Sequence, residues 1–312
     1  MVTAVAARSG IGQALLAVGD QWSLLMLQRA FLKHTRRFAE WRAELGVSES
    51  VLAARLRELV AAGLLEPSPY RVDGRTRTEY LLTERARELW TFLVSIWSWE
   101  RTWVARPAPL PDLVHERCGR RIDVTLGCAA CGAAPVTARD TRTERGPAST
   151  FADVAVPRHH RRTVREHAPS DPLSYLPETM EILGDRWSTV LLAAAFLGVR
   201  RFAGFESELG VAPSILSDRL RRFTEFGVLG QHDLPGRGHE YRLTDKGLAF
   251  FPTFAFLVDW AQRWHPGVPD SDIIMVHTAC AKPLRPYLRC DACREPLARG
   301  EIHFNLSSGG TG

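Results

Sequence analysis

The sequence lacks any apolar run that approaches the ~18 consecutive residues needed to cross a membrane. Its first residues also lack the charged, apolar and small-residue order of a secretory signal. It contains no glycine-rich phosphate loop, no nucleophile elbow and no paired His/Glu metalloprotease spacing. We therefore expect a cytoplasmic protein that has no membrane partner and is not an enzyme.

The length and composition of the chain are those of a globular protein. A chain of 312 residues suggests about two domains. Apolar residues make up 45% and charged residues 24%, which is ordinary for a globular protein with real cores. The net charge of +5 is compatible with a polyanionic partner, although it does not prove one.

An internal repeat organises the chain. Gly19-Asp20-Gln21-Trp22-Ser23 recurs as Gly184-Asp185-Arg186-Trp187-Ser188, and Leu45-Gly46-Val47 recurs as Leu209-Gly210-Val211. The three cysteines that follow the first copy recur with the same spacing after the second. The chain is therefore a duplication, and each copy carries one module and one cysteine-bearing tail.

Each module has the pattern of a helix-turn-helix. In the first copy a helix predicted around Trp41 ends at Gly46, and Ser48 is placed to cap the next helix, which ends at Gly63. In the second copy Gly210 and Gly227 mark the matching ends. The apolar stripe of the second helix should face the core, which leaves small, hydroxyl and basic residues outward for a DNA major groove. The alternative is an ordinary solvated helix face.

A predicted β-hairpin follows each helix pair. After a proline-rich turn, Tyr70–Thr83 carries Asp73-Gly74 at its centre, which is a strong hairpin signal. The tip of the second hairpin is Pro235–His239. A basic hairpin after a recognition helix is typical of a wing that contacts the DNA backbone or minor groove. The predicted DNA-contacting residues are Arg36, Arg37, Ser48, Ser50, Arg57, Arg71, Arg75, Arg77, Arg200, Arg201, Ser214, Ser217, Arg221, Arg237 and His239.

A closing helix capped by Thr83 or Thr244 ends each module. These helices hold more aromatic rings than one small module can bury, so we expect part of this surface to pack against another module. A cleft between the closing and first helices is a possible site for a small-molecule effector. The alternative is that the rings serve only as packing.

Each copy resembles the HxlR-type branch of the MarR-like winged-helix regulators. The resemblance rests on Leu183–Trp187, the Arg-Phe pairs, Leu216–Leu220 and Glu240–Gly247, and it covers roughly residues 9–105 and 174–266. It implies sequence-specific DNA binding by a dimer that forms through the first and last helices. Family members often begin the module with a cysteine that can sense thiol chemistry, whereas the corresponding positions here are Ser9 and Ser174. Two modules in one chain suggest an intramolecular pseudo-dimer, or a homodimer across chains.

The tails carry a possible metal-binding pattern. His-x2-Cys-x9-Cys-x2-Cys occurs twice, as His115, Cys118, Cys128 and Cys131, and as His277, Cys280, Cys290 and Cys293. Each set offers three thiolates and one imidazole, the donors of a tetrahedral structural zinc site. We predict one structural zinc ion in each tail, held by the ligands of that tail. A redox or disulfide pair and a metal-free ribbon remain open.

These patterns predict a mainly α protein with small β wings (α+β). The expected segments are module 1 (9–106), ribbon 1 (112–140), a linker (141–171), module 2 (174–267) and ribbon 2 (273–304). The predicted function is a transcriptional regulator that binds double-stranded DNA at a two-half-site operator. The alternative is a winged-helix adaptor that binds other proteins without specific DNA binding.

Overall fold

The computed structural model describes residues 10–106, 109–146, 151, 176–236, 238–265 and 273–305. Ser9, Ser174, Arg237 and the predicted linker beyond residue 146, except for Phe151, lie outside the described residues. Both modules are present and the α+β prediction is confirmed. No helix among the described residues is long and apolar enough to span a membrane.

The first module has the predicted order of helices and wing. Its elements are α1 (Gly10–Val18), α2 (Gln21–Leu32), α3 (Phe38–Leu45), α4 (Glu49–Ala61), β1 (Leu65–Val72), β2 (Arg75–Leu82), α5 (Glu84–Arg87) and α6 (Trp90–Trp103). Gly46 ends α3 with φ of 60°, a conformation that favours glycine, and Ser48 accepts the Val51 amide at the start of α4. The turn from α3 to the recognition helix α4 is therefore encoded locally.

The second module repeats this order. Its elements are α7 (Pro177–Leu183), α8 (Arg186–Phe196), α9 (Phe202–Leu209), α10 (Pro213–Glu225), β7 (Leu229–Leu234), β8 (Gly238–Leu243), α11 (Asp245–Ala249) and α12 (Phe251–Trp264). Thr83 and Thr244 cap α5 and α11 as predicted. Each closing segment is nevertheless a short helix followed by a long one, not a single helix.

The first wing starts earlier than its sequence suggests. Pro67 and Pro69, predicted to lie in a turn, belong to strand β1, opposite Tyr80 and Thr78 of β2. A two-stranded ribbon leaves alternate backbone positions facing solvent, so proline at these positions need not interrupt the ladder. The Asp73-Gly74 turn has positive φ at both residues, as a two-residue hairpin loop requires.

The two modules pack through their first and last helices. Helix α12 contacts both α6 and α1, and α6 contacts α7. The contacts are reciprocal, because the Trp99 indole donates to the Lys246 carbonyl at 3.0 Å and the Trp260 indole donates to the Arg85 carbonyl at 2.9 Å. The prediction that the aromatic closing helices pack against another module is confirmed within a single chain.

The tails exchange strands with each other. The tail strands are β3 (Asp112–His115), β4 (Arg120–Ile122), β5 (Val124–Cys128), β6 (Thr141–Arg145), β9 (Ile273–His277), β10 (Lys282–Pro283), β11 (Pro286–Cys290) and β12 (Ile302–Asn305). They pair as β12-β3-β4, β11-β5 and β10-β9-β6, so every one of these sheets joins the two tails. Leu126 pairs directly with its counterpart Leu288, which places the local pseudo-twofold axis between them.

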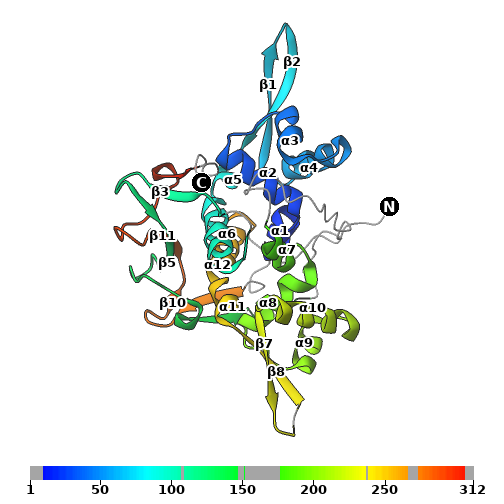
Figure 1. Cartoon of the computed structure of the whole chain (residues 1–312), viewed down its shortest axis with the longest axis vertical. Coiled ribbons are helices and arrows are strands. Elements are labelled where there is room, and N and C mark those ends of the chain that lie inside the picture. Colours follow the sequence, from blue (N-terminus) through cyan, green and yellow to red (C-terminus); the bar gives the residue numbers. More distant parts are fainter. Residues whose placement is uncertain are drawn as a thin grey trace.

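This exchange corrects two expectations. The two ribbons are not independent units, because strands of two to five residues are marginal alone and pair with the neighbouring tail. In addition, residues 141–145, assigned to the linker from the sequence, form β6 and pair with β9. The packed closing helices bring both tails to one side of the molecule, where this pairing becomes possible (Figure 1).

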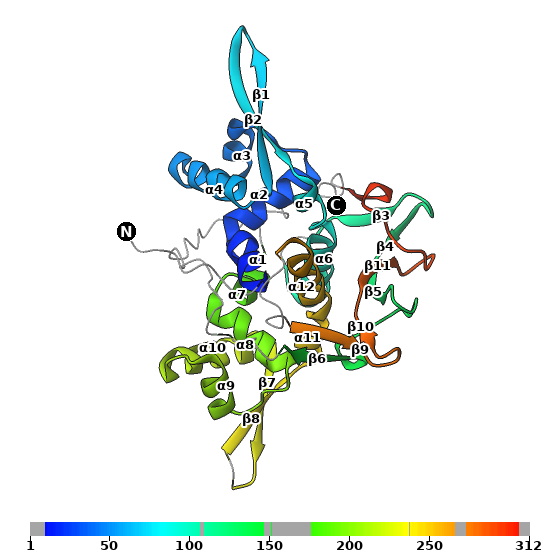
Figure 2. The same cartoon turned by 180° about the vertical axis from the view of Figure 1, so that it is seen from behind.

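The molecule is elongated, with the two wings at opposite ends of its long axis. Recognition helices α4 and α10 lie on one side, and the ribbons lie on the other (Figures 1 and 2). The closing helices α6 and α12 lie between these two sides (Figure 2).

Candidate DNA interface and metal centres

Each recognition helix is anchored by an acidic helix cap. Asp20 accepts the backbone amides of Trp22 and Ser23 at the start of α2. Its carboxylate also lies 3.3 Å from the Arg55 guanidinium on α4. Both side chains are largely buried, with exposed fractions of 14% and 11%. One carboxylate thus starts a core helix and fixes the recognition helix against it.

The second copy uses the same device. Asp185 accepts the Ser188 amide at 3.1 Å and contacts Arg219 of α10 at 2.5 Å. From the sequence, Asp20 and Asp185 were recognised only as markers of the repeat, and this anchoring role was not predicted. The signal was available, because an arginine stands at the matching position of both recognition helices.

Six of the predicted DNA-contacting residues belong to the two recognition helices and their caps. Ser48, which caps α4, and Ser50 and Arg57 on α4 are exposed, while on α10 the exposed residues include Ser214, Ser217 and Arg221. These six predicted DNA-contacting residues therefore lie on solvent-facing surface, as DNA contact requires. Whether they touch DNA stays a prediction.

The arginines on these faces have different surroundings. Arg221 bonds to Asp218 at 2.8 Å and to Glu225 at 2.5 Å. The positions matching those acids in α4 are Ala54 and Ala61, so Arg57 has no equivalent carboxylates beside it on its own helix. Arg57 is therefore the more available cation.

An arginine cluster keeps Asp218 ionised. Partial burial opposes its ionisation, but the guanidinium groups of Arg221, Arg222 and Arg219 outweigh that effect and hold its pKa below the usual value. At neutral pH this end of α10 therefore presents a network of paired charges. A phosphate that reaches Arg221 has to compete with Asp218 and Glu225.

Basic residues before α3 and α9 join the wings to the helix pair. The Arg36 carbonyl accepts the Tyr80 amide of β2 at 2.8 Å, and the Arg200 carbonyl accepts the Tyr241 amide of β8 at 2.7 Å. The side chains of Arg36, Arg37, Arg200 and Arg201 are exposed. These contacts hold each wing beside the start of its helix-turn-helix.

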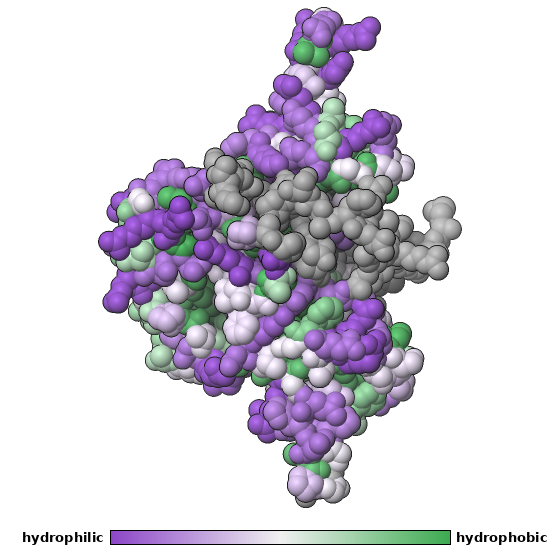
Figure 3. All heavy atoms as spheres, in the orientation of Figure 1, coloured by the Kyte–Doolittle hydropathy of each residue, from purple (hydrophilic) through white to green (hydrophobic). Residues whose placement is uncertain are grey.

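The first wing presents the predicted cations to solvent. Arg71, Arg75 and Arg77 are exposed around the hairpin tip, and Arg37 stacks over the Tyr70 ring at 4.7 Å from its centroid. Hydrophilic residues dominate this wing in the space-filling view (Figure 3). These positions suit contact with a phosphate backbone.

In the second module, helix and wing residues meet in one cleft of about 450 Å³. Its lining includes Ser217 and Arg221 of α10 and His239 of the wing. The His239 ring lies 3.0 Å from the Tyr241 hydroxyl, which orients it beside this cleft. The structure therefore brings three of the predicted DNA-contacting residues together.

The cysteines and histidines of the tails form two clusters that could hold a metal ion. One contains His115, Cys118, Cys290 and Cys293, and the other contains Cys128, Cys131, His277 and Cys280. All ligand atoms of a cluster lie within 4.8 Å of one another. Each cluster takes its His-x2-Cys pair from one tail and its Cys-x2-Cys pair from the other.

This grouping corrects the prediction that each tail holds a metal with its own four ligands. All eight residues are brought into clusters, but their partnership is exchanged between the tails. The reason is the β5–β11 pairing, which places Cys128 opposite Pro286 and Cys290 opposite Val124. Each Cys-x2-Cys knuckle therefore lies beside the other tail's histidine.

The donor geometry fits a tetrahedral zinc ion. His115 Nδ1 lies 3.4 Å from the Sγ atoms of both Cys118 and Cys293, and His277 Nδ1 lies 3.3 Å from those of both Cys131 and Cys280. Zinc–sulfur and zinc–nitrogen bonds of ordinary length at a tetrahedral angle place such atoms roughly 3.6 Å apart. A Glu301 carboxylate oxygen lies 3.9 Å from His115 Nε2, which is beyond hydrogen-bonding distance.

Comparison with known proteins identifies both modules. The model of a family described as HxlR-like helix-turn-helix matches residues 17–108 and 182–268, which is more than half of the chain. The two matched segments correspond to the two modules. The cysteine clusters lie outside both segments, since the first cluster residue is His115 and the matched ranges end at residues 108 and 268.

Several relatives match one part of the chain. The HTH-type transcriptional regulator MT3179 of Mycobacterium tuberculosis is 33% identical over 39% of this chain and 79% of its own length. YvaP of Bacillus subtilis, also described as an HTH-type transcriptional regulator, is 31% identical over 28% of this chain and 83% of its own length. The solved structure of PA1607 is 32% identical over 42% of this chain and 90% of its own, with a TM-score of 0.36.

Proposed function

Because the chain belongs to the HxlR-like helix-turn-helix family and is a transcriptional regulator of the helix-turn-helix type, we propose that it binds one two-half-site operator in double-stranded DNA as an intramolecular pseudo-dimer. The observation that carries this proposal is the arrangement of the two modules. Their recognition helices lie on one side of a single chain, and their wings lie at opposite ends of it (Figure 2). A dimeric winged-helix protein presents its two recognition helices to DNA in this way.

The packing of the closing helices supports the pseudo-dimer. The reciprocal Trp99 and Trp260 hydrogen bonds give each module the same contact with the other. The contacts of α1 with α12 and of α7 with α6 extend this interface. A second chain is therefore not needed to supply the partner module, and we expect one chain per operator.

Each module has a part in recognition. We propose that α4 and α10 enter adjacent major grooves, about one helical turn apart, while the wings contact phosphates or the minor groove. Arg57 is the side chain best placed to read a base, because its helix carries alanine where α10 carries the acids that pair with Arg221. The two half-sites should therefore differ in sequence.

Footprinting tests the pseudo-dimer. We expect protection of two half-sites about one turn apart on one face of the duplex, with one chain per duplex by mass measurement. Protection of a single half-site, or a requirement for two chains, contradicts the pseudo-dimer. Absence of any sequence-selective shift with genomic fragments favours a protein-binding adaptor.

A point variant tests the role of α4. Arg57→Ala should reduce discrimination within one half-site by about 1–3 kcal/mol. Arg142→Ala is the matched control, because Arg142 is equally a surface arginine but lies on β6 in the ribbons. Equal losses from both variants would show that only overall charge matters.

We also propose that each exchanged cluster binds one structural zinc ion. The support is the donor set of three thiols and one imidazole at distances that suit tetrahedral coordination. Short tails with few apolar residues need a cross-link such as a bound metal ion to remain folded. Since both ions would join the first tail to the second, they would fix the two halves of the chain relative to each other.

A further inference from the structure

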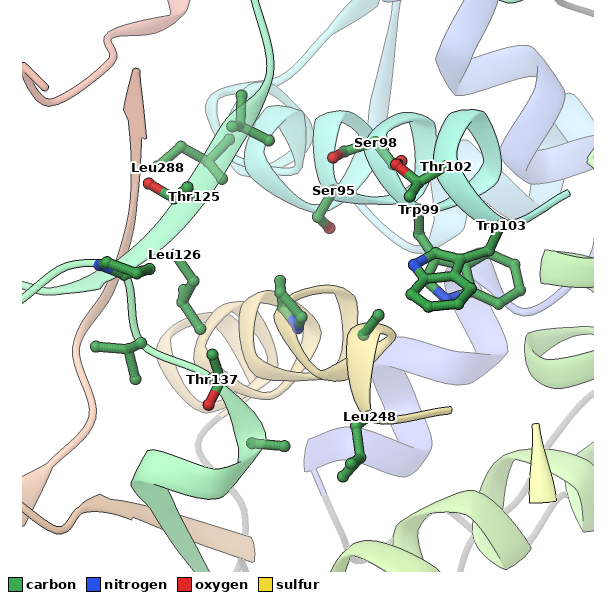
Figure 4. Close-up of a pocket in the computed structure, with 16 residues that line it drawn as sticks. Ser95, Ser98, Trp99, Thr102, Trp103, Thr125, Leu126, Thr137, Leu248 and Leu288 are labelled. Atoms are coloured by element: carbon green, nitrogen blue, oxygen red, sulfur yellow. The ribbon is translucent and has the colours of Figure 1, made fainter. Parts of the chain in front are cut away.

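A cavity lies where the two modules meet the ribbons. Its volume is about 240 Å³, and its walls come from α6, from the junction of α11 and α12, from strands β5 and β11 and from residues 135–138. Figure 4 shows Ser95, Ser98 and Thr102 along α6, facing Leu126 and Leu288 of the strands. The effector cleft predicted from the sequence would lie between the closing and first helices, whereas this cavity is bounded by the ribbons.

The lining is apolar with a row of hydroxyl groups. Among the described residues that line the cavity, none has an ionisable side chain. Two of these hydroxyls already donate within the protein, because Ser95 bonds to the Phe92 carbonyl at 2.7 Å and Thr102 to the Ser98 carbonyl at 2.9 Å. The oxygens of Ser95 and Thr102 therefore retain only acceptor capacity toward a ligand. A molecule that donates an N–H or O–H group suits them.

The repeat shows that this cavity is not an automatic consequence of the fold. The counterparts of Ser95, Ser98 and Thr102 on α12 are Phe256, Asp259 and Arg263. Where α6 has Ser95, α12 has the ring of Phe256, which is only 3% exposed. In the second copy this helix face thus carries a large ring and charged side chains where α6 carries small hydroxyl residues.

The charged residues on that side form ion pairs. Arg263 pairs with both Asp259 and Glu88, and the Trp264 indole donates to Glu88 at 2.8 Å. The counterpart of Trp264 is Trp103, which lines the cavity and is 37% exposed. One of the two equivalent places therefore carries paired charges, while the other is uncharged and flanked by indole rings.

We propose that this cavity binds a flat, uncharged aromatic molecule of one or two rings that carries an N–H or O–H donor. An engineered cavity of about 150 Å³ is large enough for benzene, so the volume here admits a somewhat larger ring system. Burial of a carboxylate or ammonium group without a partner would be costly in this lining. Trp99 and Trp103 offer aromatic surfaces for stacking or edge contacts.

The position of the cavity couples it to the second module. Trp99 lines it and donates to the Lys246 carbonyl of α11, and α11 begins directly after wing strand β8. A bound ring would contact both Trp99 of α6 and Leu248 of α11. Occupancy would therefore bias how the second wing sits against the first module. This regulatory part rests on the proposed function, whereas ligand binding itself does not.

Calorimetry with indole as the probe tests the proposal on the full-length protein. Indole should bind saturably with one site per chain. Indole-3-carboxylate should bind at least tenfold more weakly because it carries a charge, and 1-methylindole several-fold more weakly because it lacks the N–H donor. Absence of saturable indole binding, or equal binding of the carboxylate, overturns the proposal.

Two filled-cavity variants locate the site. Ser98→Phe adds a ring at a half-buried lining position, and Ser95→Phe reproduces the residue at the matching position of α12. Each should weaken indole binding at least tenfold, while Ser207→Phe on exposed α9 should bind indole as the unmodified protein does. Unchanged binding in Ser98→Phe places indole elsewhere and overturns the proposal even if Ser95→Phe does not fold.

A DNA-shift assay separates this inference from the proposed function. A change in operator affinity on adding indole, lost in Ser98→Phe, supports the coupling. Saturable indole binding by a protein that shifts no DNA contradicts the proposed function and leaves the ligand site standing. Normal DNA binding without any indole binding contradicts only the ligand site.

Discussion

The exchanged cysteine clusters allow a metal-counting experiment that distinguishes two arrangements of the same ligands. In the structure Cys118 and Cys293 share a cluster, although they belong to different tails. Cys118 and Cys131 share a tail but belong to different clusters. The double variant Cys118→Ser/Cys293→Ser should therefore lose one zinc ion and keep one. Cys118→Ser/Cys131→Ser should lose both.

The loss in the free energy of unfolding should follow the number of zinc ions lost. A ligand present at 1,000 times its dissociation constant stabilises the state that binds it by about 4 kcal/mol. The same-cluster variant should therefore lose roughly that amount, because removal of a second ligand from a site already lost adds little. The same-tail variant should lose roughly twice as much. Both comparisons use two Cys→Ser changes, so each variant is the control for the other.

The assay is zinc content by mass spectrometry on protein purified under reducing conditions, together with chelator-dependent unfolding. If the same-tail variant keeps one ion and the same-cluster variant keeps none, each tail binds its own metal and the exchange is wrong. If the unmodified protein holds no zinc and shows six reactive thiols, the clusters are not zinc sites. In either case the DNA-binding proposal would still stand.

Three further predictions concern the modules. The double variant Arg75→Ala/Arg77→Ala should weaken DNA binding across sequences. It should also lower the slope of the logarithm of the binding constant against the logarithm of the salt concentration by about 0.9 for each lost phosphate contact. An unchanged slope with relaxed specificity would mean that the wing reads bases. Asp185→Ala should destabilise the second module by about 1–2 kcal/mol in denaturant unfolding, and Asp185→Asn should recover part of this because it keeps the capping oxygen but not the charge. Burial and the neighbouring Arg85 lower the pKa of His265 to about 4, so the folded protein should lose stability at the module interface as the pH falls from 6.5 toward 4. If the unfolding midpoint of the unmodified protein does not fall over this range relative to that of His265→Gln, this prediction is wrong.

Local chemistry was enough to predict the modules themselves. Gly46 and Ser48 specify the turn between two helices, and Asp73-Gly74 specifies a hairpin, through interactions within a few residues. Because these signals occur twice, the duplication and the order of elements could be read directly. The eight metal-ligand candidates were also identifiable, since the spacing His-x2-Cys and Cys-x2-Cys is a local property.

Partnership between distant segments was decided only by the tertiary structure. Which histidine meets which cysteine knuckle depends on the pairing of β5 with β11, two strands that are far apart in sequence. The Asp20–Arg55 anchor, the reciprocal tryptophan contacts and the cavity beside Ser98 likewise need the packed modules. Both pairings of the tails satisfy the same sequence spacing. The choice between them follows from the closing helices, which place the two tails side by side, so that short strands of one tail can pair with those of the other (Figure 1).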